Sequence, residues 1–105
     1  MDPSERERLE AAGWRSATVE GFLGLSPDET ALVEMKLSLG SLLRQIRTSA
    51  HLSQGVLARR IGSSQSRVAK MEAADASVTL DLIVRALLSA GASRQAIAEA
   101  VSAQN

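Results

Sequence analysis

The segment from Leu52 to Glu72 constrains the fold more than any other part of the sequence. It contains two short stretches with helical apolar spacing, separated by only a few residues. Two helices that meet at a sharp angle need a small residue where their backbones approach and a turn residue that tolerates a positive φ. Ala58 and Gly62 fit these two places. Apolar side chains that can lock the pair together stand at matching positions: Leu57, Ile61, Val68 and Met71. The segment therefore predicts a helix-turn-helix.

Helix-capping residues predict that the rest of the chain is helical as well. Ser26, Pro27 and Glu29 form a capping box with proline at the first helical position, so we expect a long helix from there to about Ser49. Four shorter helices are expected after it. The first covers about 54–61 after the cap Ser53, and the second runs from Ser63 or Ser64, either of which can cap it, to about residue 73. The third covers about 80–90 after Thr79, and the fourth begins at about 94 after Ser93. With only one Trp and one Phe, the composition also suits helices better than strands. The prediction is an all-α domain of five helices over residues 26–105.

Residues 1–25 form a short extension before this domain. Residues 2–12 are predicted to form a short polar helix, and Arg15–Val19 an extended segment. Trp14 and Phe22 are the only aromatic residues of the chain. In so short a segment they either pack on the long helix or anchor a binding partner, and the sequence leaves both readings open.

The charges of the chain are strongly segregated, although the net charge is zero. Residues 1–34 carry a net charge of −5 and residues 72–105 carry −2. Residues 35–71 carry seven basic residues and no acidic one. An acid-free basic block is what a phosphate-binding surface requires, so this distribution favours nucleic acid as a partner.

The outward positions of the second helix in the Leu52–Glu72 segment are polar and carry no negative charge. They are occupied by Gln65, Ser66, Arg67 and Lys70. Such side chains can donate hydrogen bonds to base edges and to phosphates, although ordinary surface residues have the same chemistry. Arg59 and Arg60, on the first helix of the pair, fit a solvated helix face as well as a DNA contact.

Several other functions find no support in the sequence. There is no cysteine, and the single histidine, His51, has no second ligand or nucleophile at a useful spacing. We therefore expect no enzyme activity, no metal and no cofactor. No apolar run reaches membrane-spanning length, and residues 1–10 lack a signal-peptide core, so we expect a cytoplasmic protein that does not bind membranes.

From about Leu42 to Gly91 the chain resembles the Xre/Cro family of phage-repressor-like regulators, which implies a lambda-repressor-like helix-turn-helix domain that binds double-stranded DNA. By this resemblance Gln54 binds phosphate and braces the recognition helix, and Arg47 pairs with Glu72. The residues implied to contact bases or phosphates are Gln54, Arg59, Ser64, Gln65, Ser66, Arg67 and Lys70.

Two positions depart from the family pattern. His51 stands where glycine usually closes the first helix, and Ala74 stands where glycine usually follows the recognition helix. Histidine tolerates a positive φ better than most residues, so we expect the first turn to survive with some strain. The second departure leaves the end of the recognition helix open.

The order of motifs from Ala12 to Glu29 further resembles HigA-type antitoxins. That resemblance implies a homodimeric repressor of its own operon that neutralises a RelE-like mRNA-cleaving toxin, with Trp14 and Phe22 on the toxin-binding arm. An acidic arm would complement a basic toxin. Two alternatives remain open: a stand-alone Xre-type regulator, and a protein-interaction module on a degenerate helix-turn-helix scaffold.

Overall fold

The computed structural model describes residues 24–102. Five helices and no strand occur in this part of the chain: α3 (Pro27–Ser49), α4 (Gln54–Arg60), α5 (Gln65–Glu72), α6 (Leu80–Ser89) and α7 (Arg94–Ser102). The boundary between the compact units of the chain falls within α3, between Glu34 and Met35. The predicted all-α fold is confirmed, and the helix ends agree with the prediction to within one residue. The expected helix at residues 2–12 and the extended Arg15–Val19 segment lie outside the described residues.

The first turn of α3 is closed by a reciprocal pair of hydrogen bonds. The Ser26 backbone N–H donates to Glu29 Oε1 at 3.0 Å, and the Glu29 backbone N–H donates to Ser26 Oγ at 3.2 Å. This is the predicted capping box, which satisfies two backbone donors that have no partner within the helix. The hydrogen bond from the Ser26 backbone stabilises the carboxylate and so lowers the pKa of Glu29.

Each of the other four helices begins with a hydroxyl cap. In each case the side-chain oxygen accepts the backbone N–H three residues later, at 3.0–3.2 Å. The four caps are Ser53, Ser64, Thr79 and Ser93. For α5 the sequence left Ser63 and Ser64 open, and the structure selects Ser64. The Ser63 hydroxyl is instead buried in the turn without a hydrogen-bond partner.

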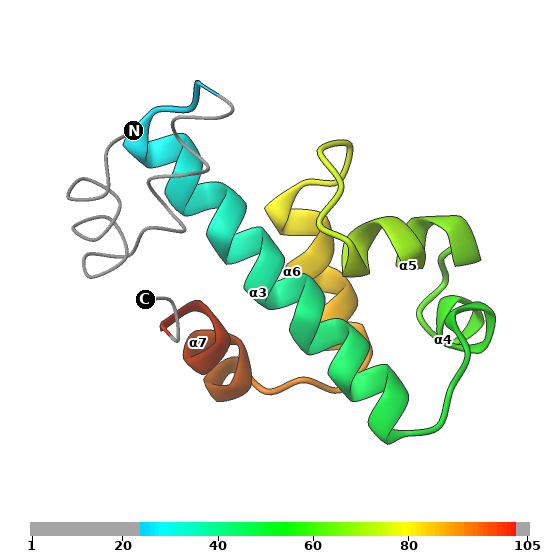
Figure 1. The fold of residues 1–105 in the computed structure, drawn as a ribbon. Coiled ribbons are helices and arrows are strands. Elements are labelled where there is room, and N and C mark those ends of the chain that lie inside the picture. The colour runs from blue at the N-terminus through cyan, green and yellow to red at the C-terminus, as the bar shows by residue number, and fades with distance from the viewer. Residues whose placement is uncertain (1–23, 103–105) are drawn as a thin grey trace, which may run out of the picture. The chain divides into compact units, whose positions relative to one another are not determined.

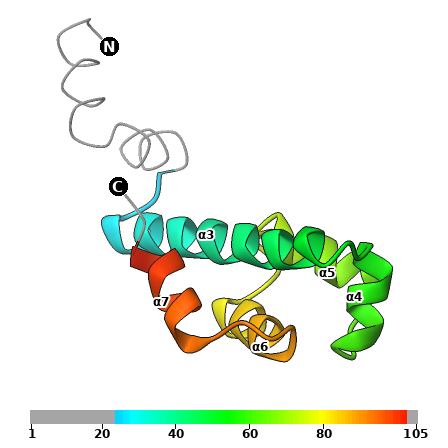
Figure 2. The same ribbon diagram turned by 90° about the horizontal axis from the view of Figure 1, so that it is seen from below.

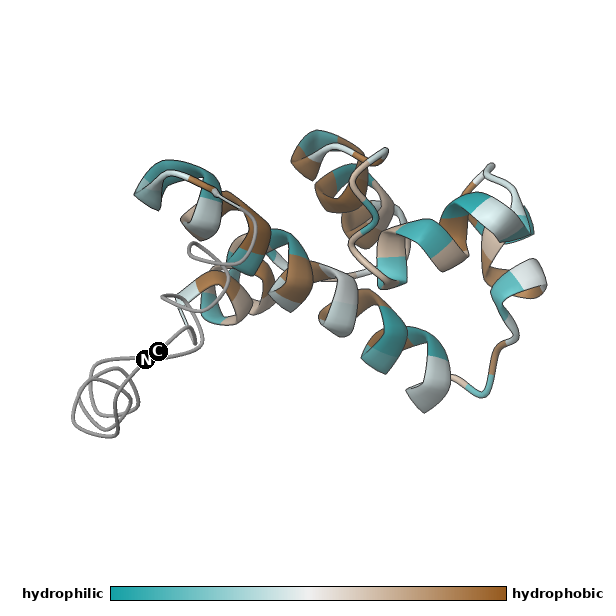
Figure 3. Cartoon of the chain, turned by 45° about the horizontal axis from the view of Figure 1, so that its top comes forward, coloured by the Kyte–Doolittle hydropathy of each residue, from teal (hydrophilic) through white to brown (hydrophobic). Residues whose placement is uncertain are grey.

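The core lies where α3, α4, α5 and α6 meet. Figures 1 and 2 both place α6 across the middle of α3, and Figure 3 shows that α6 is mostly apolar while α5 is mostly polar. The buried apolar residues are Leu39, Leu43, Leu57, Ala58, Val68, Met71, Val78, Ile83, Ala86 and Leu87. They include three of the four side chains predicted to lock the helix-turn-helix, while Ile61 is partly buried against the same cluster.

Helix α7 covers one side of this core without burying any residue completely. Ile97 and Val101 are partly buried and pack against the core cluster. Leu88, near the end of α6, is 50% exposed. Ile97 and Val101 therefore cover part of the core while part of their own apolar surface stays accessible.

Gly40 allows α3 to approach the end of α5. A Cβ at this position would lie 2.5 Å from the Met71 carbonyl oxygen and 3.0 Å from the Glu72 carbonyl oxygen. Only glycine permits this approach, because the neighbouring atoms belong to the backbone and cannot swing away. The mid-helix glycine thus marks close packing. Leu37, an apolar residue of the same helix, is 37% exposed.

Candidate nucleic-acid interface

Helices α4 and α5 form the predicted helix-turn-helix, and Figure 1 shows the short connection between them. Gly62 adopts φ 70° in the turn, a conformation that glycine reaches without steric cost. The Ser63 backbone N–H then donates to the Ala58 carbonyl at 2.7 Å. Ala58 is buried where the two helices pack, so both predicted roles, the small contact residue and the turn glycine, are confirmed.

The outer face of α5 is exposed and free of acidic residues. Val68 and Met71 are buried on the inner face, which fixes the rotation of the helix about its axis. The side chains on the other side are all exposed: Gln65, Ser66, Arg67 and Lys70. These are the four outward positions read from the sequence. These side chains can exchange hydrogen bonds with the base edges that a DNA groove presents.

Gln65 is held in place by Gln54 of α4. Gln65 Nε2 donates to Gln54 Oε1 at 3.1 Å, and Gln54 Nε2 donates to Glu72 Oε1 at 3.1 Å. The bracing contact implied by the family resemblance is therefore present. The sequence did not indicate that Gln54 is itself anchored to the end of α5, because residues 18 positions apart in sequence show no pattern that links them.

Arg47 ties α3 to both ends of the helix-turn-helix. Its Nε and Nη2 donate to the two carboxylate oxygens of Glu72 at 2.6 and 3.0 Å, and its Nη1 donates to the Leu52 carbonyl at 2.9 Å. The side chains of Arg47 and Glu72 are only 13% and 5% exposed. The hydrogen bonds to Glu72 favour the charged guanidinium and raise the pKa of Arg47. The Arg47–Glu72 pair expected from the sequence is present with two-point geometry.

Two members of the basic block serve the fold. Arg47 is paired as described, and Lys36 Nζ donates to the Asp75 carbonyl at 3.3 Å. No sequence signal marks the Lys36 contact, since the two residues are 39 positions apart. Five exposed cations of the block remain for a ligand: Arg44, Arg59, Arg60, Arg67 and Lys70. The side chain of Arg59, a predicted contact, is thus accessible.

Ser64 has a structural role in addition to any contact it makes with a ligand. Its hydroxyl accepts the Arg67 backbone N–H at 3.2 Å and lies 3.4 Å from the Ser66 hydroxyl. Ser64 therefore caps α5 and orders the first turn of the exposed face.

Both departures from the family pattern occupy left-handed backbone positions. His51 has φ 58° and Ala74 has φ 53°. The predicted positive φ at His51 is confirmed. Ala74 reaches the same region without the tolerance that histidine shows, and α5 ends before it at Glu72, with Ala73 as its C-cap.

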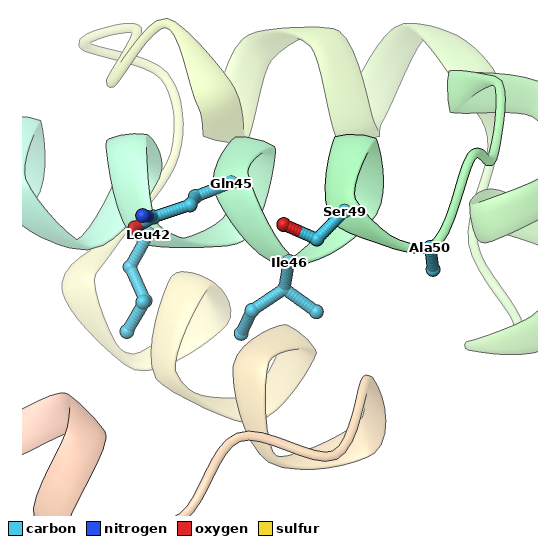
Figure 4. A pocket seen from close by; sticks show the side chains of 5 residues that line it. All are labelled: Leu42, Gln45, Ile46, Ser49 and Ala50. Carbon is cyan, nitrogen blue, oxygen red and sulfur yellow. The ribbon is translucent and has the colours of Figure 1, made fainter.

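A pocket at the C-terminal half of α3 is lined by four residues of that helix and by Ala50, which directly follows it (Figure 4). Its lining residues, none of them ionisable, are Leu42, Gln45, Ile46, Ser49 and Ala50. Among residues 24–102 there is no cluster of three metal-ligating side chains. No helix in the same range is long and apolar enough to cross a membrane. The predicted partner-binding residues Trp14 and Phe22 lie outside the described residues.

A capped recognition helix whose exposed face carries no acidic side chain follows a glycine turn on a small all-α core, and this arrangement defines a helix-turn-helix DNA-binding unit. Residues 38–100 match the family model of the helix-turn-helix domain, which is more than half of the chain, so the chain belongs to this family. Searches of curated proteins and of solved structures gave no match.

Proposed function

We propose that the chain is a sequence-specific transcriptional repressor that places α5 in the major groove of operator DNA. The observation that carries this proposal is the outer face of α5, where Gln65, Arg67 and Lys70 are exposed and no acidic side chain intervenes. Amide and guanidinium groups match the donor and acceptor patterns that base pairs present in the major groove. Ser66 completes this face as a further base contact.

A second set of residues positions the helix on the DNA backbone. Gln54 and Ser64 stand at the starts of α4 and α5, and Arg59 lies exposed on α4. Contacts of this kind go to phosphates and fix the register of a protein on the duplex, while the base contacts select the sequence. The five exposed cations of the basic block support this arrangement.

The test is a binding measurement on operator DNA selected from a random library. A triple variant with Gln65, Arg67 and Lys70 replaced by alanine is expected to lose selective binding. The matched control replaces Gln95, Arg85 and Arg94, three exposed residues of similar chemistry outside the basic block. Unchanged operator affinity in the folded α5 variant would refute the assignment of α5 as the recognition helix. Failure of the wild-type protein to select any DNA sequence would instead favour the protein-interaction module.

We further propose that the repressor acts as a homodimer on a pseudo-palindromic site. A single module of this kind buries only about 600–1,000 Å² of protein surface on DNA, which limits discrimination. Two-fold dimers place their recognition helices roughly 34–36 Å apart, one turn of the duplex. The candidate contact between the two copies of the chain is formed by Ile97 and Val101, two partly buried apolar residues of α7. Sedimentation analysis showing a monomer both free and on DNA would contradict the dimer.

The finer proposal is that the protein is the antitoxin of a HigBA-like pair and neutralises a RelE-like toxin. Its support is the charge distribution of the sequence: residues 1–34 are acidic and contain Trp14 and Phe22, which suits a basic, RNA-cutting partner. A neighbouring gene for a small basic protein would favour this function over a stand-alone regulator.

The antitoxin proposal is tested by replacing Trp14 and Phe22 with serine in the full chain. Operator binding is expected to persist while rescue of cells from the toxin is lost. Full neutralisation by the double variant would exclude these two residues as the toxin anchor. The protein would remain a helix-turn-helix repressor.

A further inference from the structure

The carboxylate of Glu72 is the fixed end of a chain of hydrogen bonds that runs to the exposed face of α5. One oxygen, Oε2, accepts from Arg47 Nε at 2.6 Å. The other, Oε1, accepts from Arg47 Nη2 at 3.0 Å and from Gln54 Nε2 at 3.1 Å. An ionised carboxylate can only accept hydrogen bonds. The Gln54 amide can therefore bind it through the NH₂ group of Gln54 and not through the carbonyl oxygen.

This constraint passes from one amide to the next. Because Gln54 turns its nitrogen to Glu72, it presents its oxygen, Oε1, to Gln65. Gln65 must then offer its nitrogen, and Nε2 donates at 3.1 Å. Reversing either amide would set oxygen against oxygen or nitrogen against nitrogen. The orientation of Gln65 is therefore dictated by Glu72, a side chain that is only 5% exposed.

We infer that Glu72 is a specificity-positioning residue: through Gln54 it fixes which end of the Gln65 amide faces the base. A free glutamine amide can rotate and exchange its donor and its acceptor, and so adapt to different base edges. With its nitrogen tied to Gln54, Gln65 keeps one sense of donor and acceptor. It then favours a base edge with the matching pattern over one that offers two acceptors, as guanine does. The inference rests on the proposed insertion of α5 into the major groove.

The experiment compares base preference by selecting sites from a random DNA library with the full-length protein and its variants. The variant Gln65→Ala identifies the base pair that Gln65 reads. Glu72→Gln replaces the acceptor-only group with one that can also donate, so the direction of the chain is no longer imposed. We expect preference at that base pair to fall about tenfold, with the other positions of the site unchanged.

Two further variants separate positioning from stability. Arg47→Lys weakens the buried pair but leaves Glu72 Oε1 to accept from Gln54, so lower stability with an unchanged base preference is expected. Gln54→Met removes the middle of the chain while Arg47 and Glu72 stay paired. It should reproduce the tenfold loss of preference even if Glu72→Gln does not fold.

The outcomes of this experiment are distinct. If the wild-type protein selects no sequence, the proposed function itself fails. If Gln65→Ala erases a preference that folded Glu72→Gln and Gln54→Met both retain, the repressor proposal stands and the positioning role of Glu72 is overturned. Loss of preference in Arg47→Lys to the same degree as in Glu72→Gln would also overturn it, because the pair would then act through stability alone.

Discussion

Gly40 and Met71 are in contact through their backbones: a Cβ on Gly40 would lie 2.5 Å from the Met71 carbonyl oxygen. The contact joins the middle of α3 to the last turn of α5. It sets how closely the recognition helix is held to the core, and no side chain takes part that could adjust to a change.

Gly40→Ala is therefore expected to destabilise the protein. In an open helix position alanine would be the better residue, but here the methyl group must displace the backbone of α5, at a cost of about 1–3 kcal/mol. The free energy of unfolding in urea measures the effect.

Gly55→Ala provides the matched control for this substitution. A Cβ on Gly55 would meet only Ser53 Oγ at 3.9 Å, an ordinary contact. The same change should stabilise the protein by up to roughly 1 kcal/mol, because alanine has less backbone freedom to lose on folding. Equal effects of the two variants would contradict the packing of α3 on α5.

Replacing Ala74 with glycine should stabilise the fold. Ala74 has φ 53°, and the left-handed region costs an ordinary L-residue roughly 1–2 kcal/mol. Glycine removes this cost, but it loses more backbone entropy on folding than alanine does, which offsets part of the gain. A net gain of about 0.5–1 kcal/mol is expected. His51→Gly should gain less, because histidine tolerates its φ of 58° better. Thermal unfolding of the two variants side by side tests the order.

Loss of Glu72 should be far more costly than loss of an exposed charge. Glu72→Ala leaves the guanidinium of Arg47 poorly solvated and unpaired, and breaking buried pairs costs about 3–5 kcal/mol. Arg85→Ala removes one partner of the exposed Arg85–Asp81 pair, whose atoms are 3.9 Å apart, and should change stability by less than about 0.5 kcal/mol. A cost for Glu72→Ala below that of Arg85→Ala would show that the buried pair does not hold α3 to the helix-turn-helix.

The two lysines should respond differently to salt when operator binding is measured. Lys70 is exposed on α5, while Lys36 is bonded to the Asp75 carbonyl. If Lys70 contacts phosphate, Lys70→Met should reduce the slope of log affinity against log salt by about 1, and Lys36→Met should leave it unchanged. A reduced slope for Lys36→Met would place that residue at the interface.

The start of α3 should respond to acid through Glu29. The pKa of Glu29 is lowered from its ordinary value of about 4.5 by the hydrogen bond from the Ser26 backbone. A lowered pKa contributes stability above the pKa of the unfolded chain, and this contribution is lost as the pH falls through the pKa of the folded state. An NMR titration of the Glu29 carboxyl should show a pKa below 4.5. Ser26→Ala should bring the pKa back toward that value, although the backbone bond limits the return.

Local chemistry explains why the helices could be predicted from the sequence. Each helix begins at a hydroxyl residue that also caps it in the structure, and Gly62 and Gly91 adopt the positive φ that ends a turn or a helix. Caps, turns and apolar spacing involve neighbours within a few residues, so a single sequence displays them.

Contacts between distant segments could not be read in the same way. The hydrogen bond from Lys36 to the Asp75 carbonyl and the approach of Gly40 to α5 depend on how the helices pack. From the sequence, Lys36 belongs to the basic block predicted to bind phosphate. In the structure its amine donates to a backbone carbonyl of the protein itself. The Arg47–Glu72 pair was anticipated through the family resemblance, since charge spacing alone does not relate residues 25 positions apart.

The position of Lys36 also has a consequence for the chemistry of the protein's amines. The chain contains only two lysines, and the amine of Lys36 is hydrogen-bonded within the fold, which leaves Lys70 as the exposed lysine amine. An amine-reactive acyl label, or an enzyme that acetylates lysine, would therefore act on the outer face of the recognition helix before it acts on α3. Acylation at that position would remove a positive charge from the surface proposed to bind DNA. Bound DNA would in turn cover the Lys70 amine, so DNA-bound protein would be modified more slowly than free protein.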